Sequence, residues 1–496
     1  MEDTGSRLLV TGATADAEAL AETVPPGRGL TLDRVWASLT VLIPVIVSLL
    51  SRMVAIDLAY HVRVGLDMLE RGELIRTDLM TFTVAGEPWV NQQWGAQVVF
   101  ALTHRAGGWA ALTVLGAALI GGSFGIVYLA CRRRGAAPRP AALLTLGGYV
   151  LAMPTMAYRP QLLVVPMFCL TLWALAGRGE RPRRLWIIPV LALAWANLHG
   201  SFFLIPLMVG LAFLEDVVTH RSTMKTLLWV GVASVLATLV NPYGFGVWTY
   251  VFDLTTNPIV RNAVSEWEPT SLNGYAGATF FLSALGVAAF LARRRIPAPW
   301  WDLLWLGTFF LLALPAIRGL LWWGLVVPVV VAGLLPDAVA QPASRRGNPM
   351  MNATLVGGLS LAIVLLLPWW RAPNEARQVE LLLREAPQPA VEAVREAVPP
   401  GSRLVVPQPW GSWFEYALPE MPLFVDPRIE LFPTELWYEY QDLRGTGAAW
   451  REVLDRWEAD AIVVDLRDWT LQDELRDDPG WRLVYEDEES AVFVRA

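Results

Sequence analysis

Long apolar segments recur along the chain from Val35 to Trp370, and this feature constrains the fold more than any other. Several of them approach the roughly 20 residues that an α-helix needs to cross a lipid bilayer, whereas a soluble core rarely needs such lengths. Hydrophobic residues make up 54% of the sequence, so one chain can supply many such segments. The sequence therefore predicts an α-helical, polytopic membrane protein.

Each apolar segment is assigned to one membrane-spanning helix, and about eleven spans are expected. Several segments are short, so their helices would need tilt or polar flanks to cross the bilayer. The expected spans are Val35–Val54, Trp109–Cys131, Pro140–Met153, Gln161–Ala176, Leu185–Ala196, Ser201–Leu214, Thr226–Val240, Ala276–Ala292, Leu303–Leu314, Leu320–Leu335 and Met351–Trp370.

The chain changes character after Trp370, where the long apolar segments end and acidic residues outnumber arginines. Strand-like and helix-like segments alternate there, as in "RLVVPQ", "AWREVLDRWEADAIVVDL" and "WRLVYEDEESAVFVRA". We therefore expect a small soluble α/β domain over residues 372–496, preceded by a transmembrane domain over residues 34–371. Residues 1–33 lack the basic start of a signal peptide and are interpreted as a flexible cytoplasmic tail.

Arginines are concentrated in alternate loops between the expected spans, for example in "CRRRGAAPRP", "GRGERPRR" and "ARRRIP". The positive-inside rule places these loops in the cytoplasm, so the first long loop and the acidic domain are expected outside it. The segment Trp89–Arg105 is apolar enough to resemble a further span, but counting it as one would place "RRRG" outside. We interpret it as an interfacial helix that lies along the outer face of the membrane.

The first outer loop carries acidic, basic and aromatic residues directly after the first span. Apolar residues at helical spacing predict an amphipathic helix over Leu58–Arg71, and Gly72 supplies a stop at its C-terminus. The chain after Gly72 is long enough to bring Asp78 back toward Asp57, so both carboxylates could face one cleft. The alternative is that Asp57 caps the N-terminus of this helix.

Further polar clusters fall on the same outer side: "AYRPQ", "NLHG", "NPYG", "SEWEP" and "IRG". Such residues could hold an amphiphilic substrate, because polar side chains bind sugar hydroxyls, aromatic rings pack on sugar rings and arginines bind phosphate. The alternative is an ordinary membrane interface, where Trp, Tyr and Arg are common. The candidate substrate-binding residues are His61, Arg63, Trp89, Asn91, Trp94, Arg159, Gln161, Asn197, His199, Asn241, Tyr243, Glu266, Trp267, Arg318, Trp410, Asp426 and Arg428.

Four of the polar and aromatic residues of the α/β domain are expected at strand ends, where open sheets place their binding crevices. They are Trp410, Trp413, Asp426 and Arg428. These side chains could bind an acceptor glycan or cover the membrane cleft. The alternative is a structural pairing of Asp426 with Arg428 inside one loop.

The pattern "D..YH.R.G...L..G.....D..T.T..G.PW.N..W", followed by "RPQ", "NLHG", "NPYG" and "EWEP", resembles the GT-C superfamily of polytopic glycosyltransferases, and within it a bacterial GT-C-like branch. The resemblance covers the chain from about Val35 to Trp370 and implies sugar transfer from a polyprenyl-phosphate donor with inversion. It implies that Asp57 is a general base or the ligand of a divalent metal, Mg or Mn, with Asp78 as a second acid. The adjacent acidic pair usual in the superfamily is absent, because Leu58 follows Asp57.

The same resemblance implies the partners and the location. The partners would be a polyprenyl-phosphate-linked sugar, an envelope glycan, lipid or protein as acceptor, and membrane lipids, with no nucleic acid. The protein would lie in a bacterial inner membrane, with its active site and α/β domain extracytoplasmic. Arg159, Arg318 and Arg63 are candidates for binding the donor phosphate. Two other classes stay open: a lipid or glycolipid transporter, which normally carries ionisable residues at mid-membrane, and a non-catalytic envelope scaffold.

Overall fold

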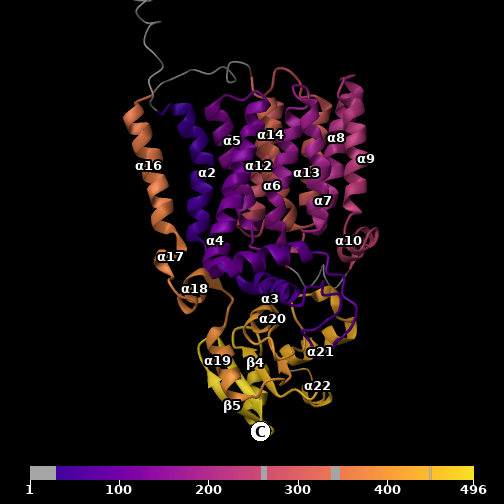
Figure 1. The fold of residues 1–496 in the computed structure, drawn as a ribbon, viewed down its shortest axis with the longest axis vertical. Coiled ribbons are helices and arrows are strands. Elements are labelled where there is room, and N and C mark those ends of the chain that lie inside the picture. The colour runs from indigo at the N-terminus through magenta and orange to yellow at the C-terminus, as the bar shows by residue number, and fades with distance from the viewer. Residues whose placement is uncertain (1–29, 258–264, 337–346, 446, 448) are drawn as a thin grey trace, which may run out of the picture.

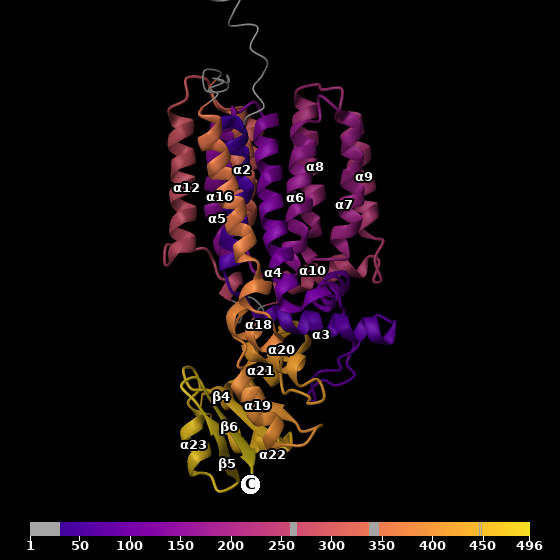
Figure 2. The same ribbon diagram turned by 60° about the vertical axis from the view of Figure 1, so that its left-hand side comes forward.

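The computed structural model describes residues 30–257, 265–336, 347–445, 447 and 449–496. Figure 1 shows a bundle of helices with a smaller α/β part below one end of it. Figure 2, turned by 60°, shows helix α3 (Ala55–Arg71) between these two parts. The predicted cytoplasmic tail, residues 1–33, lies almost entirely outside the described residues.

A helix lies at each of the predicted spans, and together these helices form the bundle (Figure 1). Within the described part of the chain, five are long and apolar enough to cross a membrane: α2 (Leu32–Leu50), α4 (Trp94–Arg133), α8 (Leu204–Val218) with the turn before it, α12 (Tyr275–Ala292) and α16 (Pro349–Leu366). The shorter helices are α5 (Pro138–Ala152), α6 (Pro160–Ala176), α7 (Ile187–Ala196), α9 (Met224–Thr238), α13 (Trp300–Ala313) and α14 (Leu320–Gly333).

Helix α4 is broken between the segment before Gly107 and the apolar, predicted membrane-spanning segment after Gly108. Gly107 and Gly108 leave the helical conformation, and Gly108 has a φ of 63° with a ψ of −153°, which residues with a side chain rarely adopt. The half before the break crosses the end of the bundle, and the half after it runs into the bundle (Figure 1). The predicted interfacial helix is therefore distinct from the second span, but it begins at Trp94 and not at Trp89.

Helix α3 begins at Ala55 rather than at the predicted Leu58, which places Asp57 inside its first turn. The residue before the helix is Val54, whose side chain makes no capping hydrogen bond. Asp57 is therefore not the N-cap residue, although as an acid in the first turn it lies where the helix dipole favours a negative charge. Helix α3 approaches α4 closely because Gly65 has no side chain: a Cβ there would lie 2.1 Å from the carbonyl oxygen of Gln97.

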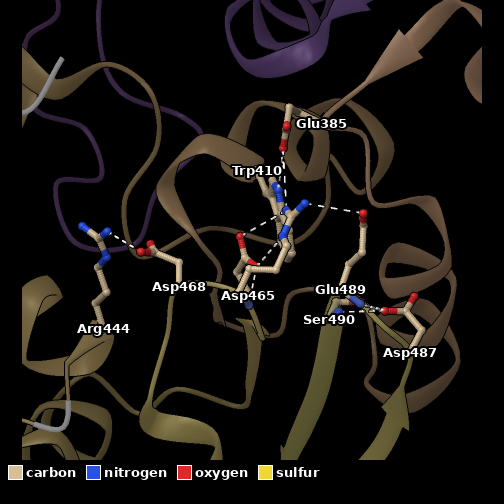
Figure 3. A network of polar contacts seen from close by, with 9 residues as sticks. Glu385, Trp410, Arg444, Asp465, Asp468, Asp487, Glu489 and Ser490 are labelled. Atoms are coloured by element: carbon tan, nitrogen blue, oxygen red, sulfur yellow. Dashed lines mark hydrogen bonds and ion pairs between the residues drawn. The ribbon is translucent and has the colours of Figure 1, made fainter. Parts of the chain in front are cut away.

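The predicted α/β part contains a four-stranded sheet. Strand β3 is parallel to β4, while β4, β6 and β5 are antiparallel neighbours in that order. A polar network lies where the central strand β4 ends and the central strand β6 begins (Figure 3). It includes Asp465, Glu489 and Trp410, whose Nε1 donates to Oε2 of Glu385 at 3.4 Å. The strands and helices are β3 (Leu404–Val405), β4 (Ala461–Asp465), β5 (Trp481–Glu486), β6 (Ser490–Arg495), α17 (Pro368–Arg371), α18 (Glu375–Leu382), α19 (Gln388–Ala397), α20 (Gln408–Ala417), α21 (Thr434–Arg444), α22 (Trp450–Arg456) and α23 (Leu471–Asp477).

The α/β part is fixed to the first outer loop by backbone contacts. Strand β1 (Met53–Val54), directly before α3, pairs in parallel with β2 (Leu383–Arg384). The hydroxyl of Ser412 accepts the backbone N–H of Tyr60 at 2.8 Å and donates to the carbonyl of Ala55 at 3.0 Å. These contacts hold α20 against the start of α3, so segments that are far apart in sequence meet at the end of the bundle.

Candidate functional site

A cavity of about 520 Å³ lies where the bundle, helix α3 and the α/β part meet. Its walls come from the start of α3, the N-terminus of α6, the turns before α8 and α14, helix α10 (Gly246–Thr256) and the loop 427–430. The cavity is therefore assembled from elements that are distant in the sequence. Its polar and aromatic lining residues are Asp57, Tyr60, His61, Gln92, Gln93, Arg159, Gln161, His199, Ser201, Phe203, Tyr250, Thr255, Trp267, Arg318, Trp322, Arg428 and Glu430.

Arg159 links two carboxylates in this cavity. It precedes α6, and Pro160 at the first helical position favours the extended backbone that Arg159 adopts. Its Nη2 lies 3.2 Å from Oδ2 of Asp57, and its Nη1 pairs with Oε2 of Glu266. Nη2 of Arg318 lies 3.3 Å from the same oxygen of Glu266. The side chain of Asp57 stays 30% exposed, so a ligand in the cavity can reach its carboxylate.

The arginines of the cavity have more N–H groups than the protein uses. Among the described residues, Nε of Arg159, Nε of Arg318 and Nη1 of Arg428 are buried without a hydrogen-bond partner. A buried donor without a partner costs free energy unless a ligand or water satisfies it. Trp267 holds Arg318 in place, with the guanidinium carbon 4.2 Å from the ring centroid. The arrangement favours an anion with several oxygen acceptors, which a phosphate group provides.

Two histidines line the cavity in the neutral form. His199 Nδ1 accepts the backbone N–H of Ser201 at 3.1 Å, which leaves Nε2 to carry the proton. Burial, with Arg318 and Arg159 nearby, lowers the pKa of His199 to about 3. Burial also lowers the pKa of His61 well below its usual value. At neutral pH both imidazoles are therefore hydrogen-bonding groups and not cations.

A second carboxyl group enters the cavity from the α/β part, and the sequence analysis did not identify it. Glu430 lies in the turn Ile429–Leu431, and the hydroxyl of Tyr250 donates to its Oε1 at 2.9 Å. Burial raises the pKa of Glu430 above its ordinary value. Tyr60 lines the same cavity as Asp57 and Glu430. Burial, followed by the charges of these two carboxylates, raises the pKa of its phenol. The only signal for Glu430 in the sequence is one acid inside the short segment "RIELF".

Asp78 does not line the cavity, which differs from the expectation that it faces Asp57. Arg428 forms buried ion pairs with both Asp78 and Asp426. Asp78 also accepts the hydroxyl of Thr81 at 2.7 Å, because the loop after α3 turns toward the α/β part. The structural pairing of Asp426 with Arg428 is present, and Arg428 lines the cavity as well. Asp78 and Asp426 therefore position Arg428 and do not contact the cavity themselves.

The predicted site residues divide into two groups according to whether they line the cavity. Those that line the cavity are Asp57, His61, Arg159, Gln161, His199, Trp267, Arg318 and Arg428, and Glu266 binds two of these arginines. Those that do not line it are Arg63, Asp78, Trp89, Asn91, Trp94, Asn197, Asn241, Tyr243, Trp410 and Asp426.

Several residues of the second group hold the surrounding backbone or pair elsewhere. Arg63 pairs with Asp67 on α3, and Trp94 donates to Oδ1 of Asn197 at 3.1 Å. Trp410 is 2% exposed, so its ring face is not available to a glycan. These side chains therefore lie outside the cavity and have their partners elsewhere.

The donor set around Asp57 does not fit a divalent metal. Its Oδ2 faces the guanidinium of Arg159, whereas Mg and Mn require several oxygen ligands around one point. The described residues contain no group of three or more His, Cys, Asp or Glu side chains that could hold an ion. The side chains around Asp57 therefore do not form a site that fits Mg or Mn.

No family model and no curated protein matches the sequence. The fold, however, is similar to that of solved structures. ArnT from Cupriavidus metallidurans in the apo state matches with a TM-score of 0.55 and 14% identity, over 98% of each chain. The same protein bound to undecaprenyl phosphate matches with a TM-score of 0.53 and 14% identity, over 92% of this chain and 96% of that one.

The oligosaccharyltransferase of Archaeoglobus fulgidus is also similar. Its structure tethered with an acceptor peptide containing the NVT sequon matches with a TM-score of 0.51 and 11% identity, over 92% of this chain and 74% of that one. At such identities the similarity shows the fold alone. It confirms the GT-C-like fold that the sequence predicted.

Proposed function

We propose that the protein is a membrane glycosyltransferase of the GT-C type, which transfers a sugar from a polyprenyl-phosphate donor with inversion. One observation carries this proposal: an accessible carboxylate, Asp57, lies among three arginines in a cavity at the end of an apolar bundle. A lipid-linked phosphate fits this position, because its chain prefers the bilayer and its charge prefers the interface. The binding of undecaprenyl phosphate by ArnT, which has the same fold, supports this class of donor.

The arginines act on the phosphate in this proposal. Arg159, Arg318 and Arg428 bind its oxygens and stabilise the charge that develops as polyprenyl phosphate departs. Arg159 pairs with Asp57 in the absence of donor. When the phosphate occupies N–H groups of Arg159, this pair weakens and Asp57 becomes free to accept a proton. Donor binding thereby prepares the base.

Asp57 acts on the acceptor. Its carboxylate takes the proton of an acceptor hydroxyl, and the hydroxyl oxygen forms a bond to the anomeric carbon. The bond from that carbon to the phosphate oxygen breaks, and its electron pair leaves with polyprenyl phosphate from the opposite face. A positioned general base contributes about 10²- to 10⁴-fold to such a step, and orientation and phosphate stabilisation supply the rest.

The proposal includes a location and an acceptor class. The arginine-rich loops lie at the end of the bundle remote from the cavity, so the positive-inside rule favours an extracytoplasmic cavity and α/β part. We propose an inner membrane of a bacterium as the location and an envelope glycan, lipid or protein as the acceptor. The transporter alternative has less support, since the buried acids Glu215, Asp216 and Asp302 pair with arginines near helix ends.

Binding of undecaprenyl phosphate tests the proposal. We expect the purified protein to bind this lipid, and Arg318→Ala to weaken binding about 10- to 100-fold, the range of one charge-assisted hydrogen bond. Arg63→Ala is the matched control, because Arg63 lies on α3 outside the cavity and should leave the affinity unchanged. Titration of intrinsic tryptophan fluorescence measures the dissociation constants. Equal loss in both variants, or no binding by the wild type, would contradict the proposal.

A further inference from the structure

Glu430 is the cavity carboxyl group that the mechanism above does not use. It is contributed by the α/β part, and no Lys or Arg among the described residues lies within ion-pair distance of it. The hydroxyl of Tyr250 donates a hydrogen bond to its carboxyl group, which also interacts with the backbone N–H of Glu430 itself. The side chain of Glu430 is half-buried and forms no ion pair among the described residues, so ion pairing does not account for its position.

The loop that carries Glu430 is held rigidly by other residues. Arg428 is anchored by its buried ion pairs, and its backbone N–H donates to Oδ1 of Asp426 at 2.7 Å. The carbonyl of Arg428 accepts the N–H of Leu431 at 2.9 Å, which closes the turn around Glu430. Because the scaffold is complete without the carboxyl of Glu430, that group is available to a ligand and is placed accurately for one.

The groups around Glu430 are suited to hydroxyls. Tyr250 and Tyr60 supply two phenols beside it, and the neutral imidazoles of His61 and His199 line the same cavity. Carboxyl, phenol and neutral imidazole groups accept and donate hydrogen bonds, which matches a ring with several hydroxyls. Arg159 and Arg318 lie with Asp57 and Glu266, whereas Arg428, in the loop that carries Glu430, pairs with Asp78 and Asp426. All three arginines line the cavity and are assigned to the phosphate.

We propose that Glu430, together with Tyr250 and Tyr60, binds hydroxyl groups of the transferred sugar, so that the α/β part supplies the sugar-binding wall of the site. The substrate class is an uncharged, polyhydroxylated glycosyl unit on a polyprenyl phosphate. This inference rests on the proposed function and adds a specificity-determining residue to it. Glu430 acts as a binding group and does not take part in proton transfer.

The test compares lipids with and without a sugar. The probes are undecaprenyl phosphate and its conjugates with a neutral hexose, an N-acetylhexosamine and a pentose, each titrated against the full-length protein. We expect the wild type to bind at least one conjugate at least about tenfold tighter than undecaprenyl phosphate itself. Glu430→Ala should reduce this difference in affinity between the conjugate and undecaprenyl phosphate to less than about threefold, while the affinity for undecaprenyl phosphate itself stays unchanged.

Two further variants separate binding from folding. Tyr250→Phe keeps the ring and removes only the hydroxyl that reaches Glu430, so it should reduce the difference in affinity partly. Glu435→Ala removes an exposed acid of α21 outside the cavity and should change nothing. The inference would be overturned if Glu430→Ala still bound the sugar conjugate at least about tenfold tighter than undecaprenyl phosphate. It would also be overturned if the wild type bound undecaprenyl phosphate and every sugar conjugate with the same affinity. Failure of the wild type to bind any of the lipids would instead contradict the proposed function.

Discussion

Asp57→Asn is expected to lower glycosyl transfer at least about 100-fold, because the amide cannot accept the proton of the acceptor hydroxyl. Donor binding should stay within a few-fold, since Asn keeps the size of the side chain and leaves Arg159 free for the phosphate. The fold should also survive, because the side chain of Asp57 is partly exposed and does not cap α3. Transfer of radiolabelled sugar from the lipid phase to host envelope membranes measures the rate.

The matched control is Asp67→Asn. Asp67 lies on the same helix and pairs with Arg63, but it does not line the cavity, so its variant should keep full activity. A fully active Asp57→Asn protein would refute the assignment of the base. A loss of activity that matches a loss of folded protein would indicate a structural role for Asp57 instead.

The second large effect is expected on the free energy of unfolding, for the variant Arg428→Ala. Arg428→Ala leaves two fully buried carboxylates, Asp78 and Asp426, without their cation. Removing one partner of a buried ion pair typically costs about 3–5 kcal/mol, and here the ion pairs also hold the first outer loop against the α/β part. We expect a marked fall in the melting temperature of the purified protein.

Arg444→Ala is the control for this effect. Arg444 pairs with Asp468 at 2.6 Å on the surface of the α/β part (Figure 3), and both side chains are about half exposed. An exposed pair contributes about 0–1 kcal/mol, so the melting temperature should hardly change. Similar melting temperatures for the two variants, measured by differential scanning fluorimetry, would show that the Arg428 cluster does not hold the two parts together.

Much of the fold follows from properties that are local in the sequence. The length of an apolar segment predicts a span without knowledge of its neighbours, and the structure has a helix at each predicted position. Arg159 could likewise be identified, because it lies in the polar cluster "AYRPQ" between two expected spans. Asp57 could be recognised from its place directly after the first span.

Other parts of the site depend on contacts between distant segments. Glu430 and Tyr250 lie in short, mostly apolar stretches, and only folding brings α10 and the loop 427–430 to one cavity. The partner of Asp78 is Arg428, which lies 350 residues further along the chain, so the burial of Asp78 left no local signal. The sequence therefore predicted Asp78 as the second acid of the site, whereas the second carboxyl group that lines the cavity belongs to Glu430.

The most direct test of the central claim is the structure of the protein with undecaprenyl phosphate, determined by electron cryomicroscopy in a lipid nanodisc. The account predicts density for the phosphate inside the cavity, within hydrogen-bonding distance of the guanidinium groups of Arg159 and Arg318, and for a chain that leaves toward the bilayer. Asp57 should then lie separated from Arg159. Phosphate density at any other place on the protein, with the pair of Asp57 and Arg159 intact, would contradict the account.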